Sequence, residues 1–300
     1  MSPSSNTKNN KNTTPLGKVF LVGAGPGAAD LITVRGAKLL AKADVVFHDA
    51  LVEPEMFALC PQAELVPVGK RCGKLSSAQQ FINKRLVDAA HKYKTVIRLK
   101  GGDPMLFGRA DEEIIALQDA SIEVEIVPGI TAALAGAASI SQSLTLRGVS
   151  RSVAFITLAQ GVESANHATS NQPASTQPIS NPSADTLVYY MGRKDAAKIA
   201  KQLIEQGKIG GIHQPNTPIQ ILEAVSTPRE RLWTSTLQDL ADGKADEWFD
   251  SNSPALIMVG KALRKKANQA IEAAKSESSS TKVDNGPQDG KILSHSVRRA

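Results

Sequence analysis

A glycine-rich loop near the start of the chain is the first place where the residue types suggest a binding site. Glycines stand at positions 23, 25 and 27, directly after an apolar run at 19–22 that is typical of a buried strand. Because glycine has no Cβ, a ligand could approach the backbone closely there. A helix expected over 31–41 would offer free N–H groups at its start. The pattern predicts a loop that binds a nucleotide-like cofactor, and a tight turn without a ligand is the alternative.

Two classes of cofactor compete for this loop. Residues 23–28 formally fit the relaxed dinucleotide fingerprint G-x-G-x-x-A. That motif also needs an acidic residue about 20 residues further on to hold the ribose, and Asp44 and Asp49 stand at roughly that distance. Pro26 is unusual in such a loop, because it removes an N–H donor where a pyrophosphate needs one. The loop alone therefore leaves the choice of cofactor open.

Residues that could do chemistry elsewhere in the first half also follow expected strands. Strands are expected at 44–47, 65–68, 95–99 and 124–127, with helical segments between them. This alternation predicts an α/β fold with a mostly parallel sheet covered on both faces. In such sheets ligands bind outside the carboxyl ends of the strands. The residues expected to share that edge are the loop at 23–27, Asp49, Lys70, the loop at 101–103 and Thr131.

The second half contains further strands and one long polar segment. Strands are expected at 152–157, 186–191, 218–223 and 255–259. Residues 160–185 are rich in Ser, Asn, Pro and Thr and have too few large apolar side chains to order themselves, which predicts a flexible surface insertion. The expected organisation is a disordered tail at 1–16, an N-terminal α/β domain at 17–130, a C-terminal α/β domain at 131–265 that carries the insertion at 160–185, and a disordered tail at 266–300.

Composition and charge argue against several classes of protein. Hydrophobic residues make up 41% and charged residues 21% of the 300 residues, as in ordinary globular proteins. No apolar run reaches the ~18 residues of a membrane span, and the N-terminal residues lack the apolar core of a signal peptide. The formal net charge is +6, but each tail contributes +2, so the charge gives no argument for a nucleic-acid partner. We expect a cytoplasmic protein with no membrane and no nucleic-acid partner.

The cysteines and histidines give no sign of a metal site. Cys60 and Cys72 are too far apart for a C-x-x-C motif, and the five histidines have no metal-ligand spacing. The low cysteine content favours a reducing compartment. We therefore expect no metal ion in the site.

Five short motifs occur in order along the chain. They are Val-Gly-Ala-Gly-Pro-Gly at 22–27, Gly-Lys-Arg at 69–71, Arg-Leu-Lys-Gly-Gly-Asp-Pro-Met-Leu-Phe-Gly-Arg at 98–109, Val-Pro-Gly-Ile-Thr-Ala at 127–132 and Tyr-Tyr-Met-Gly at 189–192. Together these motifs closely resemble those of the tetrapyrrole methylases. The resemblance covers roughly residues 17–263, and the block at 98–109 is its most specific part.

This resemblance implies a fold of two α/β domains with the active site in the cleft between them, and a homodimer. Members of the family bind S-adenosylmethionine in a folded conformation and release S-adenosylhomocysteine. The family's acid/base pair maps to Asp49 and Lys70. Its cofactor contacts map to Pro26, Gly101, Gly102, Asp103, Leu106, Thr131, Ala132, Met191 and Val225.

The resemblance also implies a reaction. It is the transfer of two methyl groups from S-adenosylmethionine to C2 and C7 of uroporphyrinogen III, giving precorrin-2 for sirohaem or cobalamin synthesis. Arginine and lysine side chains expected near the site could bind the carboxylates of this tetrapyrrole. These basic residues are Arg71, Lys74, Lys100, Arg109, Arg147 and Arg151.

Some positions depart from the family pattern, and other functions stay open. Ala28 stands where the family often has Asp, Leu75 where it often has His, and 143–147 differ from its usual Pro-Leu-Thr-His-Arg, so the exact substrate is open. Alternatives within the fold are methylation of another precorrin, an RNA ribose or a diphthine precursor. An NAD-dependent oxidoreductase and a non-catalytic binding module are alternatives of other classes.

Overall fold

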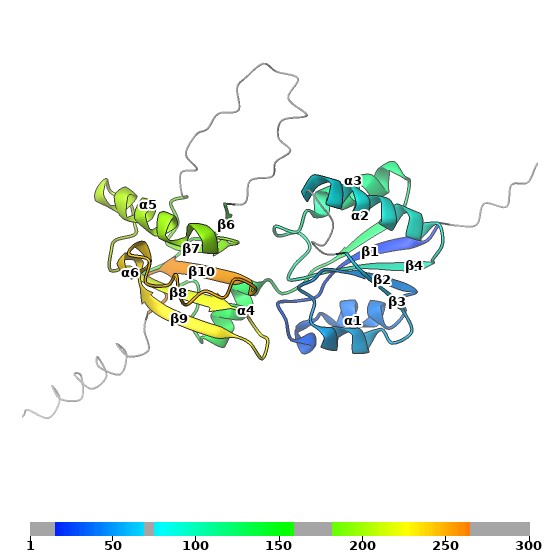
Figure 1. Cartoon of the computed structure of the whole chain (residues 1–300), viewed down its shortest axis with the longest axis horizontal. Helices are drawn as coiled ribbons and strands as arrows, with labels where there is room; N and C mark the ends of the chain where they lie inside the picture. Colours follow the sequence, from blue (N-terminus) through cyan, green and yellow to red (C-terminus); the bar gives the residue numbers. More distant parts are fainter. Residues whose placement is uncertain (1–15, 69–74, 159–181, 265–300) are drawn as a thin grey trace, which may run out of the picture. The chain divides into compact units, whose positions relative to one another are not determined.

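A computed structural model describes residues 16–68, 75–158 and 182–264 (Figure 1). In these residues the chain forms two five-stranded sheets, one from each half of the sequence. The two predicted tails, apart from Leu16, and most of the predicted insertion lie outside the described residues, as does Lys70. No helix in the described ranges has the length and apolar character needed to cross a membrane.

The first sheet is parallel throughout, as the sequence predicts, with the strand order β3-β2-β4-β1-β5. Because all five strands point the same way, their carboxyl ends lie along one edge. The strands are β1 (Lys18–Gly23), β2 (Val45–His48), β3 (Glu64–Pro67), β4 (Thr95–Lys100) and β5 (Val124–Val127).

Helices cover both faces of the first sheet (Figure 1). One face packs on α1 (Val34–Leu40) and the 3-10 helix η2 (Pro54–Leu59), and the other on α2 (Leu75–Ala90) and α3 (Ala110–Asp119). The first helix is shorter than the predicted 31–41. It begins after Thr33, whose hydroxyl accepts a hydrogen bond from the Gly36 N–H and caps the helix. The 3-10 turn η1 (Ala29–Leu31) precedes it.

The strand order places the first glycine loop next to the loop after β4. From β1 the chain crosses past β4 to reach β2, and from β4 it crosses past β1 to reach β5. The connections of these two neighbouring strands therefore leave in opposite directions. Such a reversal is where open α/β sheets bind their ligands.

The second sheet is mixed, with the order β6-β7-β10-β8-β9. Only β6 and β7 pair in parallel, and the other pairs are antiparallel. The strands are β6 (Val153–Thr157), β7 (Thr186–Tyr190), β8 (Pro218–Glu223), β9 (Arg231–Thr236) and β10 (Ala255–Gly260). Strand β9 and helix α6 (Leu237–Ala241) were not predicted, because β9 is an edge strand with a largely polar sequence and no buried residue.

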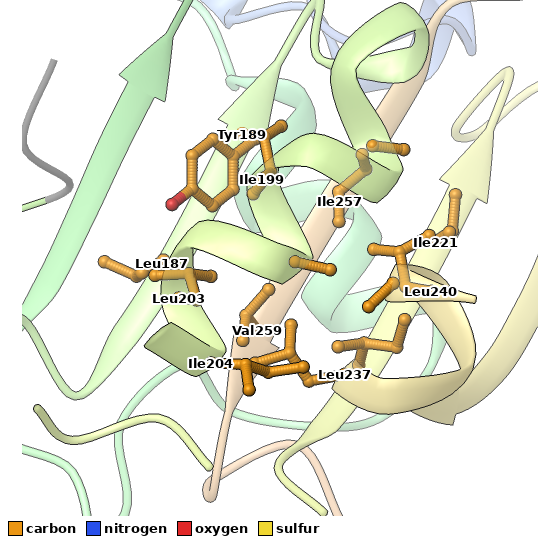
Figure 2. Close-up of a cluster of buried hydrophobic side chains, with 14 of the residues drawn as sticks. Leu187, Tyr189, Ile199, Leu203, Ile204, Ile221, Leu237, Leu240, Ile257 and Val259 are labelled. Carbon is orange, nitrogen blue, oxygen red and sulfur yellow. The ribbon is translucent and has the colours of Figure 1, made fainter. Parts of the chain in front are cut away.

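Alternate residues of β7 enter two different cores. Leu187 and Tyr189 pack with α5 (Ala196–Lys208) and α6 on one face of the sheet, where Tyr189 is fully buried (Figure 2). Val188 and Tyr190 face helix α4 (Ala132–Ser139) on the other side. This alternation, expected for a strand, sends Tyr190 toward the residues discussed below.

The chain passes from the first sheet to the second between Val127 and Ala132, since α4 packs on the second sheet. The domain limits of 17–130 and 131–265 stay a prediction. At the end of the predicted insertion, Ala184 is buried in the core. Asp185 accepts hydrogen bonds from the backbone N–H groups of Arg151 and Ser152. Ala184 and Asp185 therefore belong to the packed structure and not to a flexible insertion, which corrects the predicted end of that segment.

Candidate functional site

The loops that follow β1 and β4 are joined backbone to backbone. The Gly25 N–H donates to the Gly102 carbonyl over 3.2 Å, and the Gly102 N–H donates to the Gly25 carbonyl over 2.7 Å. Both residues have positive φ angles, +79° and +70°, a region that favours glycine. The two loops predicted to bind a cofactor therefore form one unit at the sheet's carboxyl edge.

Gly23 and Gly27 face the protein rather than open space. A Cβ on Gly23 would lie 2.5 Å from the Gly129 Cα, and a Cβ on Gly27 would lie 2.8 Å from the Val225 carbonyl oxygen. Neither distance is possible for a real Cβ. Glycine is needed at these two positions because neighbouring backbone fills the space that a side chain would occupy, not because a ligand approaches there. Pro26 lies between them and is half-buried.

Gly101 and Gly102 are the open part of the paired loops. A Cβ on Gly102 would meet no atom closer than the Thr131 Cα at 4.0 Å, and one on Gly101 would meet only the Leu51 side chain, 3.3 Å away. Both residues are partly exposed. A flat or extended ligand could therefore lie against the Gly102 backbone, with the Leu51 side chain beside Gly101.

Asp103 ties the second loop to the start of the second half. Its carboxylate accepts one hydrogen bond from the Met105 N–H and one from the Gly129 N–H, both over 2.8 Å. Its carbonyl accepts from the N–H of the half-buried Leu106. A carboxylate has about four lone-pair directions, so each oxygen can accept a further bond from a ligand hydroxyl or amine. The predicted ligand contact and this structural role are compatible.

Thr131 and Ala132 begin helix α4, and the Thr131 side chain contacts Tyr190. Thr131 is the N-cap residue, but its hydroxyl makes no capping bond; its Oγ1 lies 2.6 Å from the Tyr190 hydroxyl. The Tyr190 oxygen also accepts from the Ala133 N–H over 3.2 Å. Burial raises the pKa of Tyr190, so its phenol keeps its proton. Sequence reasoning gave Tyr190 no role, although it stands within the motif at 189–192.

Met191 and Val225, the remaining predicted cofactor contacts, have different environments. Met191 follows β7 with a φ of +56° and an exposed fraction of 56%. The Val225 side chain is buried against α4, while its backbone meets the first glycine loop at Gly27. The neighbouring Ser226 hydroxyl accepts from the Ala28 N–H over 3.2 Å, which links this turn to the loop. A contact of Val225 with a ligand in the predicted site would therefore come from its backbone and not from its side chain.

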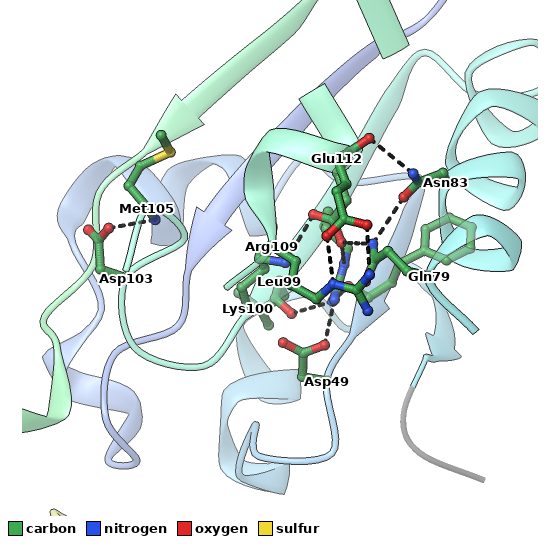
Figure 3. A network of polar contacts seen from close by, with 12 residues as sticks. Asp49, Gln79, Asn83, Leu99, Lys100, Asp103, Met105, Arg109 and Glu112 are labelled. Atoms are coloured by element: carbon green, nitrogen blue, oxygen red, sulfur yellow. Dashed lines mark hydrogen bonds and ion pairs between the residues drawn. The ribbon is translucent and has the colours of Figure 1, made fainter. Parts of the chain in front are cut away.

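Asp49 ends a chain of alternating charges that runs into the first core (Figure 3). Its Oδ1 lies 2.5 Å from Arg98 Nη2. Arg98 Nε and Lys100 Nζ each lie 3.0 Å from one carboxylate oxygen of Glu113. The Asp49 side chain is 29% exposed, whereas the other three are at most 3% exposed. Only the Asp49 end of this network can meet a ligand.

Burial and the neighbouring charges act differently on the two cations. For Arg98, burial alone would lower the pKa, but attraction to Asp49 and Glu113 outweighs it and raises the pKa, so the guanidinium stays charged. For Lys100, burial together with the Arg98 charge lowers the pKa, and attraction to Glu113 only partly opposes them. Lys100 is thus held inside the network, and the prediction that it binds substrate carboxylates is wrong.

The other predicted basic residues fall into two groups, those outside the described residues and those within them. Arg71, Lys74 and Lys70 lie outside the described residues, so the Asp49–Lys70 pair stays a prediction. Arg109 forms two close contacts with Glu112, and Arg147 and Arg151 are exposed. In the described part of the chain no group of three or more His, Cys, Asp or Glu residues could hold a metal ion.

Comparisons with known proteins agree with this arrangement. The model of the family "Tetrapyrrole (Corrin/Porphyrin) Methylases" matches residues 18–241. A uroporphyrinogen-III C-methyltransferase of Pseudomonas aeruginosa is 39% identical over 85% of this chain and 98% of its own length. A siroheme synthase of Psychrobacter is 38% identical over 83% of this chain, but the match spans only 48% of that protein.

A solved structure is similar over most of both chains. It is uroporphyrin-III C-methyl transferase from Thermus thermophilus complexed with S-adenyl homocysteine, with a TM-score of 0.65 and 35% identity over 83% of this chain and 94% of the other. The family model covers most of the chain, and the glycine loops, Asp103 and Thr131 stand in its characteristic motifs. The chain belongs to the tetrapyrrole methylase family.

Proposed function

We propose that this chain is an S-adenosylmethionine-dependent methyltransferase that transfers two methyl groups to C2 and C7 of uroporphyrinogen III and forms precorrin-2. The observation that carries the proposal is the backbone pairing of Gly25 with Gly102 at the point where the strand order reverses. The names of the relatives support the choice of donor and acceptor. The product would enter sirohaem or cobalamin synthesis.

The residues around the paired loops fit the methyl donor. Gly101 and Gly102 leave open backbone beside the N-cap Thr131, and Asp103 keeps acceptor capacity for hydroxyl or amine groups. The exposed thioether of Met191 offers a soft apolar contact for an adenine or a sulfonium. The proposed contact set is Pro26, Gly101, Gly102, Asp103, Leu106, Thr131, Ala132, Met191 and the backbone of Val225.

The donor supplies an electrophilic methyl group on a positively charged sulfur. The chain's own task is to align an electron-rich pyrrole carbon with that methyl group and to exclude water. For each methyl group added, one proton must leave the macrocycle, and we assign its removal to Asp49, with Lys70 as the partner. Arg147 and Arg151, which are exposed, are proposed to bind substrate carboxylates.

A dinucleotide cofactor fits the same loops poorly. The dinucleotide fingerprint needs a helix that starts within the glycine loop, so that its first N–H groups meet the pyrophosphate. Here α1 begins only at Val34, after the η1 turn, and Thr33 already caps it. The space beside Gly27 is filled by residues 225–227. This geometry argues against the oxidoreductase alternative.

Binding calorimetry tests the choice of cofactor. S-adenosylhomocysteine should bind the chain with micromolar affinity, and NADH should give no heat of binding under the same conditions. Binding of NADH without S-adenosylhomocysteine would overturn the proposal. The homodimer and the cytoplasmic location also stay proposals, and sedimentation analysis of the purified chain tests the first of them.

A further inference from the structure

The Tyr190 side chain contacts two segments beside the open glycines, the start of α4 and the loop after β4. Its hydroxyl meets Thr131 and the Ala133 N–H at the start of α4. Its ring lies 5.2 Å, centroid to centroid, from the ring of Phe107, which follows Gly101 and Gly102 in the same loop. The next residue along the chain is Met191. The contacts of this single side chain therefore span the surroundings of the proposed donor site.

The Tyr190 and Thr131 hydroxyls share a hydrogen bond in which either oxygen could be the donor. The Tyr190 oxygen accepts from the Ala133 N–H, and the phenol has one hydrogen of its own to donate. Thr131 Oγ1, 2.6 Å away, is an acceptor within reach of that hydrogen. If Tyr190 donates to Thr131, the Thr131 hydroxyl hydrogen is left for another acceptor, and the Thr131 Cα lies 4.0 Å from where a Cβ on Gly102 would stand.

The same contacts replace the usual cap of helix α4. A threonine at the N-cap normally accepts a hydrogen bond from the N–H two or three residues later, which would hold its hydroxyl against its own helix. In this chain the Tyr190 oxygen accepts from the Ala133 N–H instead. The Thr131 hydroxyl is thereby released from capping, and beyond its bond to Tyr190 it keeps capacity for a further hydrogen bond.

We propose that Tyr190 is a positioning residue for the methyl donor, acting through Thr131 and the first turn of α4. Its hydroxyl aims the Thr131 side chain, and its ring packs on Phe107 so that the loop after β4 keeps its place beside that turn. The inference rests on the proposed function, because it takes S-adenosylmethionine and S-adenosylhomocysteine as the ligands. It adds a residue that does not itself belong to the proposed contact set.

Tyr190→Phe is the direct test, because it removes the hydroxyl and keeps the ring. We expect S-adenosylhomocysteine to bind about tenfold more weakly, the size of one net hydrogen bond. The matched control is Tyr189→Phe, the same change one residue earlier. Tyr189 faces the opposite core, among α5 and α6 (Figure 2), so its variant should bind S-adenosylhomocysteine as the wild type does. Thermal unfolding of both variants checks that each is folded at the temperature of the titration.

A double-mutant cycle then separates positioning from general loosening. If Tyr190 acts through the Thr131 hydroxyl, the Thr131→Val change already removes the group that Tyr190 orients. The variant carrying both changes should then bind no more weakly than Thr131→Val alone. Thr131→Ser keeps the hydroxyl and should stay within about threefold of the wild type, since a net hydrogen bond is retained.

The outcomes distinguish this inference from the proposed function. If the wild-type chain does not bind S-adenosylhomocysteine, the proposed function fails. If the wild type binds and Tyr190→Phe binds equally well, the positioning role alone is overturned. Equal losses in Tyr189→Phe and Tyr190→Phe, or fully additive losses in the cycle, also contradict it.

Discussion

The Asp49 carboxylate lies 2.5 Å from the Arg98 guanidinium, and this contact connects the sheet edge with a buried network of charges. Arg98 shares its charge between Asp49 and Glu113, and Glu113 also binds Lys100. Two carboxylates and two cations alternate, so the formal charges of the four side chains cancel. This arrangement fixes the direction of the one carboxylate that reaches the edge, where the proposed substrate would lie.

Asp49→Asn tests whether that carboxylate removes the proton. The amide keeps the size of the side chain but cannot act as a base, so turnover should fall by about 10²- to 10⁴-fold. Affinity for S-adenosylhomocysteine should stay nearly unchanged, because Asp49 is not in the proposed donor contact set. Steady-state rates and calorimetry measure the two effects. Near-normal turnover in a folded variant would remove the base role from Asp49 and leave the methyltransferase assignment intact.

Glu113→Gln tests the buried network itself. It removes one of the two carboxylates that balance Arg98 and Lys100, and breaking a buried ion pair costs about 3–5 kcal/mol. Urea unfolding should show a loss of this size. Adding Lys100→Met to this variant should recover part of it, because the unpaired buried cation is then gone.

Glu112→Gln is the matched control for that change. It alters the neighbouring residue, whose ion pair with Arg109 is about 40% exposed, so the loss should stay within about 1 kcal/mol. Equal losses in the Glu112 and Glu113 variants would mean that the buried network has no special weight in stability.

Gly102→Val tests whether the open backbone beside Thr131 holds the donor. The new side chain would enter space that no protein atom fills, so binding of S-adenosylhomocysteine should be lost. A positive φ also makes valine unfavourable there, by about 1–3 kcal/mol. Gly148→Val is the control, since Gly148 has a φ of +77° and open space around it in another loop. Both variants should lose similar stability, and only Gly102→Val should lose binding; unchanged binding would place the donor elsewhere.

His213 should make stability depend on pH. Its ring is buried, Nε2 donates to the Ala184 carbonyl, and burial lowers its pKa below the ordinary value of 6.5, with Lys261 acting in the same direction and Asp185 against it. Below pH 6.5 the unfolded chain takes up a proton on His213 before the folded chain does. Stability should therefore fall as the pH drops from 6.5 toward the lowered pKa, by up to about 1.4 kcal/mol per pH unit.

The measurement for His213 compares two chains across pH. Urea unfolding of the wild type and of His213→Gln at pH 7.5 and 5.5 isolates this residue, because other titrating groups are common to both. The wild type should lose more stability than the variant on acidification. Equal losses would contradict a buried neutral His213 in the folded state.

The parallel sheet could be predicted from the sequence because its three central strands, β1, β2 and β4, are largely buried and mostly apolar. The meeting of the glycine loops, Asp49 and Thr131 near one edge followed from strand direction. Strand β9 could not be predicted in this way, since an exposed edge strand such as Arg231–Thr236 has no apolar pattern. Helix α1 begins at Val34 instead of the predicted residue 31, because Thr33 caps it. Hydrophobic periodicity does not reveal such a cap.

The contacts between side chains in the candidate site could not be predicted from the sequence. Arg98 and Lys100 inside an otherwise apolar strand were a signal that a buried acidic partner exists, but the sequence does not identify Glu113 as that partner. The contact between Thr131 and Tyr190 joins residues far apart in the chain and depends on how α4 packs against β7. Packing of this kind has no local sequence pattern.

Mass spectrometry of the reaction product tests the proposed double methylation of uroporphyrinogen III. The chain is incubated without oxygen with uroporphyrinogen III and S-adenosylmethionine that carries a deuterated methyl group, and the tetrapyrrole is then isolated. We expect a product that carries two labelled methyl groups, located at C2 and C7 by NMR, together with two equivalents of S-adenosylhomocysteine. An unlabelled tetrapyrrole, from a chain that is folded and binds S-adenosylhomocysteine, would contradict this proposal.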